Sequence, residues 1–343
     1  MKELHAITQH IHVVRLNPLF TLLQLLWAVL SSKPYQVHYF YQWNAARKIQ
    51  RLIEHINPDC IFAQLVRTAE YVKEFHHIPK ALDYMDALSV GLQRRADASP
   101  YWMRWIIQEE QRRVEAYEHT IFEYFDRHFI ISKQDQQRIR HPKNSSITIL
   151  ANGVDTTFFE PRAPQEPSVD LLFTGNMGYM PNIMAAERLV LRIVPLVRQA
   201  FPDVRVLIAG AEPSPRVQRL TSANVEVTGW VEDIRNAYQR ARIFIAPMEI
   251  GSGMQNKLLE AMSMAVPCIT SPIAAGAFQH VPDLPCLVAE TDEEMAAHCI
   301  AWMQDAQRRE QMAERARRFA VDHCSWNAAN KPLLDFVSEC AGN

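Results

Sequence analysis

Glycine is scarce in this chain of 343 residues, and its distribution is uneven. Only ten glycines occur, and Gly91 is the only one that precedes Gly153. Glycine-rich loops bring backbone N–H groups close to phosphates, because a residue without Cβ permits a tight turn and a close approach. The first half of the chain therefore lacks such a loop, and candidate phosphate-binding segments lie in the second half.

Cysteine patterns and long apolar runs are also missing. None of the six cysteines shows CxxC or other metal-ligand spacing, which favours reduced, mostly buried thiols in a cytoplasmic protein. We expect no signal peptide, because the first residues are polar. The most apolar window, Leu19–Leu30, is shorter than the roughly 20 residues that span a bilayer. It predicts a buried helix; the alternative is a helix that lies on a membrane surface, which would give peripheral membrane contact.

An excess of basic charge is absent as well. The formal net charge is −2, so we expect no nucleic-acid binding driven by bulk charge. The halves differ, because residues up to Leu150 contain 19 Lys and Arg against 15 Asp and Glu, and the remainder contains 17 against 23. The first half also holds ten of the 13 histidines. A basic half would suit anionic lipid or a phosphorylated acceptor, although ordinary surface charge explains it equally well.

Short β-type runs alternate with helical patterns along the chain, which predicts parallel sheets with helices on both faces. The expected strands are His10–Val14, Cys60–Gln64, Lys80–Tyr84, His128–Ser132, Ile147–Leu150, Leu171–Thr174, Val204–Ala209, Val225–Thr228, Ile243–Ala246, Pro267–Thr270 and Cys286–Ala289. The expected helices are Pro18–Ser31, Trp43–Ile56, Thr68–His77, Tyr101–Phe125, Asn182–Ala200, Ser214–Leu220, Asp233–Arg240, Gln255–Ala265 and Glu293–Ala320. The fold class is therefore α/β, with two doubly wound, Rossmann-like domains that face a cleft.

A proline-rich segment separates the two domains. Residues 151–169 open with the turn Asn152-Gly153 and contain three prolines, a composition typical of an extended linker. We therefore assign residues 1–150 to a first domain and 170–322 to a second. Residues 323–343 form a C-terminal helix that packs on its own domain or crosses back to the first.

The strongest chemical signal is the segment Pro247–Pro267. An apolar strand runs into Gly251, Ser252 and Gly253, and a helix opens at about Met254. Lys257 lies in its first turn, which is unfavourable for the helix dipole unless an anion lies between them. Glu260 follows on nearly the same face. We predict a diphosphate site in which the backbone from Gly251 to Met254 and Lys257 hold phosphate and Glu260 accepts sugar hydroxyls. The alternative is a glycine-capped turn with a surface Lys–Glu pair.

A second glycine turn follows another strand. Gly175, Asn176 and Met177 precede Gly178, and a helix begins after Pro181. Because ligands of open α/β sheets bind at the carboxyl ends of strands, both turns are expected to border one nucleotide pocket. The spacing is not G-x-G-x-x-G, so a dinucleotide oxidoreductase is disfavoured. Glu212 is placed to reach a ribose or to serve as an ordinary turn residue. The backbone of the segment Thr228–Asp233 is a further candidate border, although Asp233 as a helix N-cap is favoured.

The segments TGNMGYMPN, VTGWVEDI, GSGMQNKLLEAMSMAVP and ANGVD together resemble glycosyltransferase family 4, and QNKLLEAM is most similar to sugar transferases associated with exosortase and exopolysaccharide loci. The resemblance implies a GT-B fold, with a nucleotide-sugar donor in the second domain and a glycan or lipid-linked acceptor at the first. It also implies a retaining, metal-independent transferase of surface polysaccharide biosynthesis without a cofactor. The absence of D-x-D and of zinc-type histidine pairs agrees with metal independence.

Three departures from the family pattern stand out. The earlier of two family glutamates is Ser252 here, with Glu249 three residues out of register. No Arg or Lys lies in Gly175–Asn182, which leaves Lys257 as the phosphate cation. The family's opening strand, glycine turn and helix before His10 have no counterpart, so the first domain is expected to be reduced. A catalytically impaired or non-catalytic nucleotide-sugar-binding protein of the same fold is therefore the alternative function.

Carboxylates mark the acceptor side of the first domain. Asp83 and Asp86 follow a predicted strand, and Asp83 is the candidate base for an acceptor hydroxyl, whereas Asp86 is favoured as a helix cap. Arg112 and Arg113 belong to a charge run that reads as a solvated helix face, with acceptor-phosphate binding as the minor alternative. The aromatic pair Trp102 and Trp105, one turn apart, is expected to serve packing rather than to bind sugar.

Overall fold

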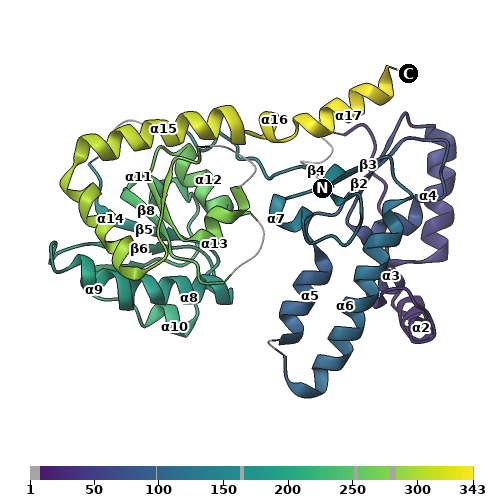
Figure 1. Ribbon diagram of the computed structural model, residues 1–343, viewed down its shortest axis with the longest axis horizontal. Helices are drawn as coiled ribbons and strands as arrows, with labels where there is room; N and C mark the ends of the chain where they lie inside the picture. Colours follow the sequence, from purple (N-terminus) through teal and green to yellow (C-terminus); the bar gives the residue numbers. More distant parts are fainter. Residues whose placement is uncertain (1–7, 98, 163–165, 251–253, 279–282, 343) are drawn as a thin grey trace. The chain divides into compact units, whose positions relative to one another are not determined.

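The computed structural model describes residues 8–97, 99–162, 166–250, 254–278 and 283–342, and its contacts divide the chain into two units (Figure 1). Unit 1 comprises Met1–Ile130, Asp135–Thr148 and Asp335–Asn343. Unit 2 comprises Ile131–Gln134 and Ile149–Leu334. Each unit is built on its own mainly parallel sheet with helices between the strands, so the predicted α/β class is confirmed.

The sheet of unit 1 has four described strands, in the order β1 (Ile61–Gln64), β2 (Lys80–Asp83), β3 (Arg127–Ile130) and β4 (Thr148–Ile149). The pairs β1–β2 and β2–β3 are parallel. The helical segments around it are α2 (Pro18–Ala28), α3 (Tyr35–Phe40), α4 (Trp43–Ile56), α5 (Leu88–Asp97), α6 (Tyr101–Phe122), α7 (Lys133–Gln136) and the 3₁₀ turns Val66–Tyr71 and Asn144–Ser146.

Two predicted elements of unit 1 are wrong. Residues His10–Val14 form no strand, because this mostly exposed segment has no neighbouring strand to pair with. The helix expected at Thr68–His77 is the short 3₁₀ turn Val66–Tyr71, followed by turns. The Thr68 hydroxyl donates to the carbonyls of Gln64 and Leu65 at 2.8 and 2.9 Å, which is a local alternative to regular helical bonding.

The sheet of unit 2 has six described strands, and every pair in it is parallel. Their order is β10 (Cys286–Val288), β9 (Cys268–Thr270), β8 (Ala241–Ala246), β5 (Val169–Thr174), β6 (Val206–Ala209) and β7 (Val225–Val227). The direction of winding reverses between β5 and β8. Crevices at such a reversal, outside the carboxyl ends of the strands, are where doubly wound sheets bind ligands.

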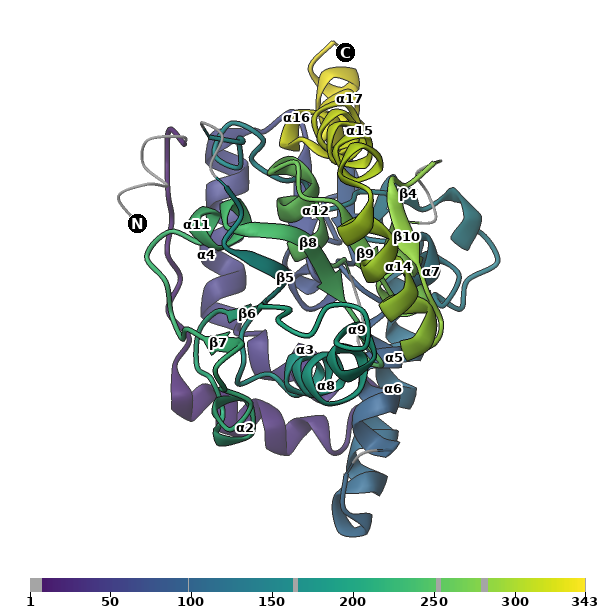
Figure 2. The same ribbon diagram turned by 90° about the vertical axis from the view of Figure 1, so that its left-hand side faces the viewer.

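Figures 1 and 2 show helices of unit 2 packed around this sheet. They are α8 (Met180–Arg188), the π-helical segment Leu189–Ile193, α9 (Val194–Val197), α10 (Pro215–Gln218), α11 (Arg235–Gln239), α12 (Asn256–Ser263), α13 (Pro272–Ala275), the 3₁₀ turn Gly276–Phe278, α14 (Asp292–Gln304) and α15 (Ala306–Cys324). The chain continues in α16 (Trp326–Ala329), which belongs to unit 2, and α17 (Lys331–Ala341), most of which groups with unit 1. Strands β5 and β6 are buried throughout, which fits their continuous apolar sequences.

The helix predicted over Glu293–Ala320 is two helices. Asp305 ends α14 in an extended conformation, and its Oδ1 accepts from the N–H of Arg308 at 2.9 Å, which caps α15. Thr291 and Glu294 form a reciprocal capping box at the start of α14. An apolar pattern continues across the break, so the pattern alone did not reveal it.

The segment predicted as a linker packs on α15 over part of its length. Val154 is buried, and its N–H donates to the Cys324 carbonyl at 2.8 Å. Arg317 of α15 donates to the carbonyls of Thr156 and Phe159, both at 3.0 Å. The C-terminal residues Asp335–Asn343 group with unit 1, where Glu339 pairs with Arg127 at 2.6 Å.

Candidate functional site

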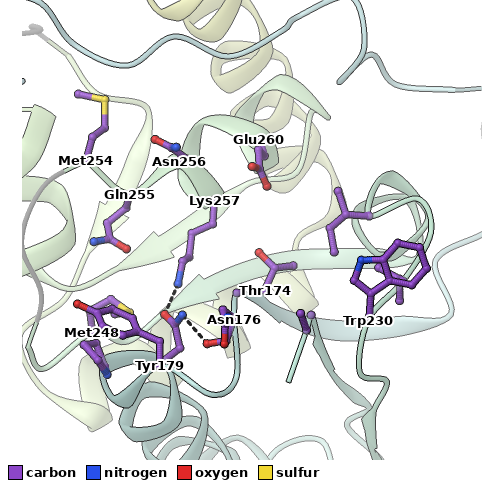
Figure 3. A pocket seen from close by; sticks show the side chains of 17 residues that line it. Thr174, Asn176, Tyr179, Trp230, Met248, Met254, Gln255, Asn256, Lys257 and Glu260 are labelled. Carbon is purple, nitrogen blue, oxygen red and sulfur yellow. Dashed lines mark hydrogen bonds between the residues drawn. The ribbon is translucent and has the colours of Figure 1, made fainter. Parts of the chain in front are cut away.

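The main candidate site is a cavity of about 510 Å³ in unit 2, at the carboxyl ends of β5, β6, β7 and β8 (Figure 3). Its walls come from the loops after these strands and from the start of α12. This is the edge at which the winding of the sheet reverses. The residues that line it are Thr174, Gly175, Asn176, Tyr179, Pro181, Asn182, Gly210, Ala211, Trp230, Val231, Ile234, Met248, Met254, Gln255, Asn256, Lys257 and Glu260.

Two glycines allow the loops after β5 and β6 to meet. Gly210 has φ of +142°, and a Cβ there would lie 1.8 Å from the carbonyl oxygen of Gly175. Gly175 has φ of +156°, and a Cβ there would lie 2.8 Å from Asn182 Nδ2 and 3.1 Å from Lys257 Nζ. A side chain at either position would collide with backbone or with the cation of the site, so both glycines are required by the geometry.

Lys257 projects from the first turn of α12 into this cavity. Its Nζ donates to Asn182 Oδ1 at 2.6 Å and lies 4.6 Å from the centre of the Phe173 ring. Asn182 Nδ2 in turn donates to the carbonyl of Asn176 at 2.9 Å, as the dashed lines in Figure 3 show. Asn182 therefore links the cation on α12 to the glycine turn after β5.

Burial lowers the pKa of Lys257 to about 8, and the carboxylate of Glu260 partly offsets this effect. A lysine held in partly buried surroundings gains more from an entering anion than a lysine in water, because the local dielectric is lower. Lys257 is the only cationic side chain among the described residues that line the cavity. The site is thus suited to a group with negative charge.

Glu260 lies one turn further along α12, and Figure 3 shows it at the same cavity. Its Oε2 accepts from the Tyr238 hydroxyl at 2.7 Å, and Tyr238 Oη also lies 2.9 Å from Thr174 Oγ1. Burial raises the pKa of Glu260, while the hydrogen bond from Tyr238 and the charge of Lys257 lower it. Tyr238 is fully buried, so it fixes the orientation of the carboxylate.

The other predicted donor-site residues have different fates. Gly175, Asn176 and Met254 line the cavity, and Asn176 Nδ2 donates to Glu212 Oε2 at 3.1 Å. The prediction that Met177 contacts the donor is corrected for its side chain, which is fully buried in the core. The N–H of Met177 donates to the Ala211 carbonyl at 2.7 Å. Its apolar side chain packs under the turn instead of facing a ligand. Gly251, Ser252 and Gly253 lie outside the described residues.

Two secondary candidates are also placed by the structure. Glu249, the out-of-register glutamate, accepts from Arg192 Nη1 at 2.9 Å and borders a neighbouring cavity with Arg188 and Asp292. It does not line the cavity of Lys257. Trp230 and Val231 do line that cavity, and the Trp230 side chain is 74% exposed. The segment after β7 therefore borders the site, which agrees with its prediction as a candidate border of the nucleotide pocket.

In unit 1, Asp83 ends strand β2 and is buried. Its Oδ1 accepts from the N–H of Met85 at 2.8 Å, and burial raises its pKa. In the same unit, the buried Glu118 of α6 accepts from the N–H and hydroxyl of Ser89 at 3.2 and 2.6 Å. Burial raises the pKa of Glu118 to about 7. The cap at the start of α5 is therefore supplied by a distant glutamate and not by a residue of the loop alone.

The long charged helix is only partly solvated. Arg113 is buried and donates to Glu109 Oε1 at 2.7 Å and to the Ala28 carbonyl at 2.7 Å, which ties α6 to α2. Arg112 is exposed and pairs with Glu109 at 2.9 Å. Trp102 and Trp105, predicted to serve packing, are 68% and 66% exposed, so neither is packed in the core.

Sequence reasoning missed the residues that orient the two charged groups. Asn182 lay in a recognised turn–helix segment, but its amide became informative only when Lys257, 75 residues away, was seen to bond to it. Thr174 ends an apolar strand and Tyr238 lies inside a short helical segment, and neither was singled out from the sequence. A polar side chain at the last position of a buried strand, as in Thr174, is the signal that would have suggested a site.

The described residues offer neither a metal site nor a membrane-spanning helix. No group of three or more His, Cys, Asp or Glu side chains is arranged to hold a metal ion. Among the described helices, none combines the length and apolar character that crossing a bilayer requires.

The sequence of unit 2 matches a known family. Residues 168–305 match the family model described as glycosyl transferases group 1. The rest of the chain lies outside the match. No curated protein matches the chain.

Solved structures share the fold at low sequence identity. A glycosyltransferase from Rickettsia africae has a TM-score of 0.67 and 15% identity, over 100% of this chain and 88% of that one. Sucrose-phosphate synthase from Thermosynechococcus elongatus has a TM-score of 0.63 and 14% identity, over 87% and 77%. Anabaena HepE, in complex with UDP and glucose, has a TM-score of 0.60 and 13% identity, over 84% and 80%. The predicted GT-B architecture is thus confirmed, while the narrower likeness to family 4 and exosortase-associated transferases stays a prediction.

Proposed function

We propose that this protein is a glycosyltransferase that takes a sugar from a nucleotide-diphosphate donor bound in the cavity of unit 2. The observation that carries the proposal is the position of Lys257 Nζ, 2.6 Å from Asn182 and beside the glycine turn after β5. The group 1 domain supports the same reading, since its match covers the strands and loops that line this cavity. The UDP complexes of Anabaena HepE make UDP the first nucleotide to test.

In this proposal the diphosphate lies between Lys257 and the start of α12. The helix begins at Asn256, and its first N–H groups carry partial positive charge that favours an anion. Transfer leaves negative charge on the departing diphosphate, which a preorganised cation stabilises more strongly than it stabilises the intact donor. Lys257 would perform this role without a metal ion.

Glu260 would hold the sugar part of the donor. A carboxylate accepts hydrogen bonds from sugar hydroxyls, and Tyr238 keeps it in one orientation by donating to Oε2. Glu260 would therefore select a ligand with hydroxyl donors next to its diphosphate. A nucleotide lacking these hydroxyls would leave a partly buried carboxylate unsatisfied, which is costly.

The acceptor in this proposal is a glycan or lipid-linked glycan handled by unit 1, in cytoplasmic synthesis of a surface polysaccharide. Retention of configuration follows the family resemblance, with the acceptor attacking from the face of the leaving group. Inversion would instead require a base, for which Asp83 is our candidate because burial raises its pKa.

A non-catalytic nucleotide-sugar-binding protein is the second candidate function. It is favoured by one specific observation, the engagement of Glu249 in an ion pair with Arg192 beside a different cavity. With Ser252 at the family's glutamate position, no described glutamate other than Glu260 lines the donor cavity. Such a protein would bind the donor but transfer nothing.

Two measurements separate these candidates. Melting temperatures with UDP, GDP, ADP and their sugars identify the donor, because a ligand that prefers the folded state raises stability with its concentration. Donor hydrolysis or transfer is then followed with the selected sugar nucleotide, with the Asn182→Ala variant as a control that keeps the lysine but removes its partner. Binding with turnover supports the transferase. Binding without turnover on any acceptor supports the second candidate, and no shift with any nucleotide contradicts both.

A further inference from the structure

Helix α2 presents an apolar face to solvent. Its leucine and tryptophan side chains at positions 19, 22, 23, 26 and 27 follow one helical stripe, which Leu30 continues just beyond the helix end, and all of them are 57–80% exposed. An amphipathic helix of a water-soluble domain normally turns such a stripe toward the core. The buried helix predicted for Leu19–Leu30 is therefore wrong in its orientation, although the helix itself is present.

The opposite face of α2 carries the polar residues and faces the protein. Thr21 is buried and accepts from Gln42 Nε2 at 3.1 Å, and Gln24 Oε1 lies 3.3 Å from His38 Nδ1. Ala28 is buried, and its carbonyl accepts from Arg113. These contacts fix the rotation of the helix about its axis, so the apolar face is held outward by specific bonds.

A second apolar protrusion lies on the same unit. Tyr101, Trp102 and Trp105, in the first turns of α6, are 66–90% exposed. Figures 1 and 2 both show α2 and this end of α6 at the lower end of unit 1. Tryptophan and tyrosine are the side chains that prefer the boundary between lipid headgroups and acyl chains.

Basic charge predominates around these two protrusions, with Asp97 as an exposed acidic residue near the first turn of α6. From residue 4 to residue 53 the sequence has no Asp or Glu, and it has five Arg and Lys. Arg15 is exposed just before α2. Arg104 is exposed beside the tryptophans of α6, where its guanidinium donates to the carbonyls of Ala96 and Asp97, both at 3.3 Å. Basic residues that flank an exposed apolar helix favour an anionic lipid surface.

We propose that α2 and the first turns of α6 dock unit 1 on an anionic phospholipid bilayer, with the leucines and tryptophans in the headgroup boundary and the arginines on the phosphates. A second copy of the chain fits less well, because an isologous contact through this face would bring arginines of like charge together. The proposal goes beyond the proposed function and does not depend on it, since docking involves no residue of the donor cavity.

Vesicle flotation without nucleotide tests this proposal. The full chain is mixed with vesicles of phosphatidylcholine alone or of an equimolar mixture with phosphatidylglycerol. We expect the wild type to float with the anionic vesicles at least tenfold more than with the neutral ones, and less so at high salt. Leu23→Glu and Trp105→Glu should each reduce the floating fraction several-fold. Leu191→Glu is the matched control, because Leu191 is an equally exposed leucine of unit 2.

Leu23, Trp105 and Leu191 are exposed, so their substitution should leave the melting temperature unchanged. A change in flotation therefore reports a change in lipid binding and not a loss of folding. Absence of flotation by the wild type, equal flotation with both vesicles, or equal effects of Leu23→Glu and Leu191→Glu would overturn the proposal. Sedimentation without lipid provides a further check. A dimer that Leu23→Glu dissociates would assign this face to a second copy of the chain and also overturn it.

Discussion

At the scale of single residues, the site depends on groups whose surroundings change their chemistry. The sequence does not show that the pKa of Lys257 is unusual. In the structure, burial lowers this pKa to about 8, and a hydrogen bond to Asn182 fixes the position of the amine. Gly210 is an ordinary turn glycine, but it is the point at which two loops touch. The sequence predicted that Lys257 and Glu260 share one face of a helix, because that follows from helical spacing. It did not reveal Asn182 or Tyr238, because their roles depend on contacts between distant segments.

Gly210→Ala should destabilise the protein and weaken nucleotide binding. The new Cβ would lie 1.8 Å from the Gly175 carbonyl oxygen, so the loops after β5 and β6 must separate. Overpacking of this kind costs about 1–3 kcal/mol or more, which urea unfolding can measure. Gly91→Ala is the control, since no atom lies within 4 Å of its Cβ. It lies in helix α5 and should stabilise by about 0.5–1 kcal/mol. Similar destabilisation by both variants would contradict the role given to Gly210.

Diphosphate affinity should depend on pH through Lys257. The free protein holds this lysine with a pKa of about 8, and a bound anion raises that value, so the complex binds more protons than the free protein above pH 8. Affinity should therefore be greatest below pH 8 and fall as pH rises, by at most about tenfold per pH unit. Calorimetric titration from pH 7 to about pH 9.5 measures this. Lys257→Arg stays charged throughout and should give a flat profile; equal slopes would refute the assignment.

At the scale of elements, the long periodic segments were predictable and their surroundings were not. The sequence predicted α4 at its observed bounds and α6 to within three residues, because their apolar periodicity and end signals are clear. It missed the break at Asp305, because an Asp within a helical pattern is usually a surface residue. Only the structure shows that the Asp305 side chain caps α15. It also placed α2 in the core, because apolar content is visible in sequence and the direction of a helix face is not.

Asp305→Ala should weaken the junction between α14 and α15. The variant removes the Oδ1 acceptor of the Arg308 N–H and leaves an uncapped helix start. Loss of an N-cap side chain costs about 1 kcal/mol, measurable as a lower urea midpoint with unchanged slope. Asp305→Asn retains an acceptor and should keep most of the stability. An Asn variant as unstable as the Ala variant would show that charge, and not capping, matters here.

At the scale of the whole molecule, the alternation of strands and helices predicted the two parallel sheets, because connection rules restrict such a pattern to few topologies. The boundary between units was less accessible. The predicted linker packs partly on α15, and the last residues group with unit 1, through contacts that join distant parts of the chain. The first half of the chain is more basic than the second. This difference suggests a role at an anionic surface only when the exposed apolar face of α2 is also known. The proposed function rests on one cavity within unit 2.

The most direct test of the account is calorimetric titration of wild type and Lys257→Ala at pH 7, with the nucleoside diphosphate selected by the thermal panel and with its nucleoside. A charge-assisted bond to phosphate contributes about 1.5–3 kcal/mol, so the variant should bind the diphosphate about ten to one hundred times more weakly. Its affinity for the nucleoside should change by less than about twofold on the same scale. Equal losses for both ligands, or an unchanged diphosphate affinity in a variant that still folds, would contradict the assignment of this cavity as a diphosphate site.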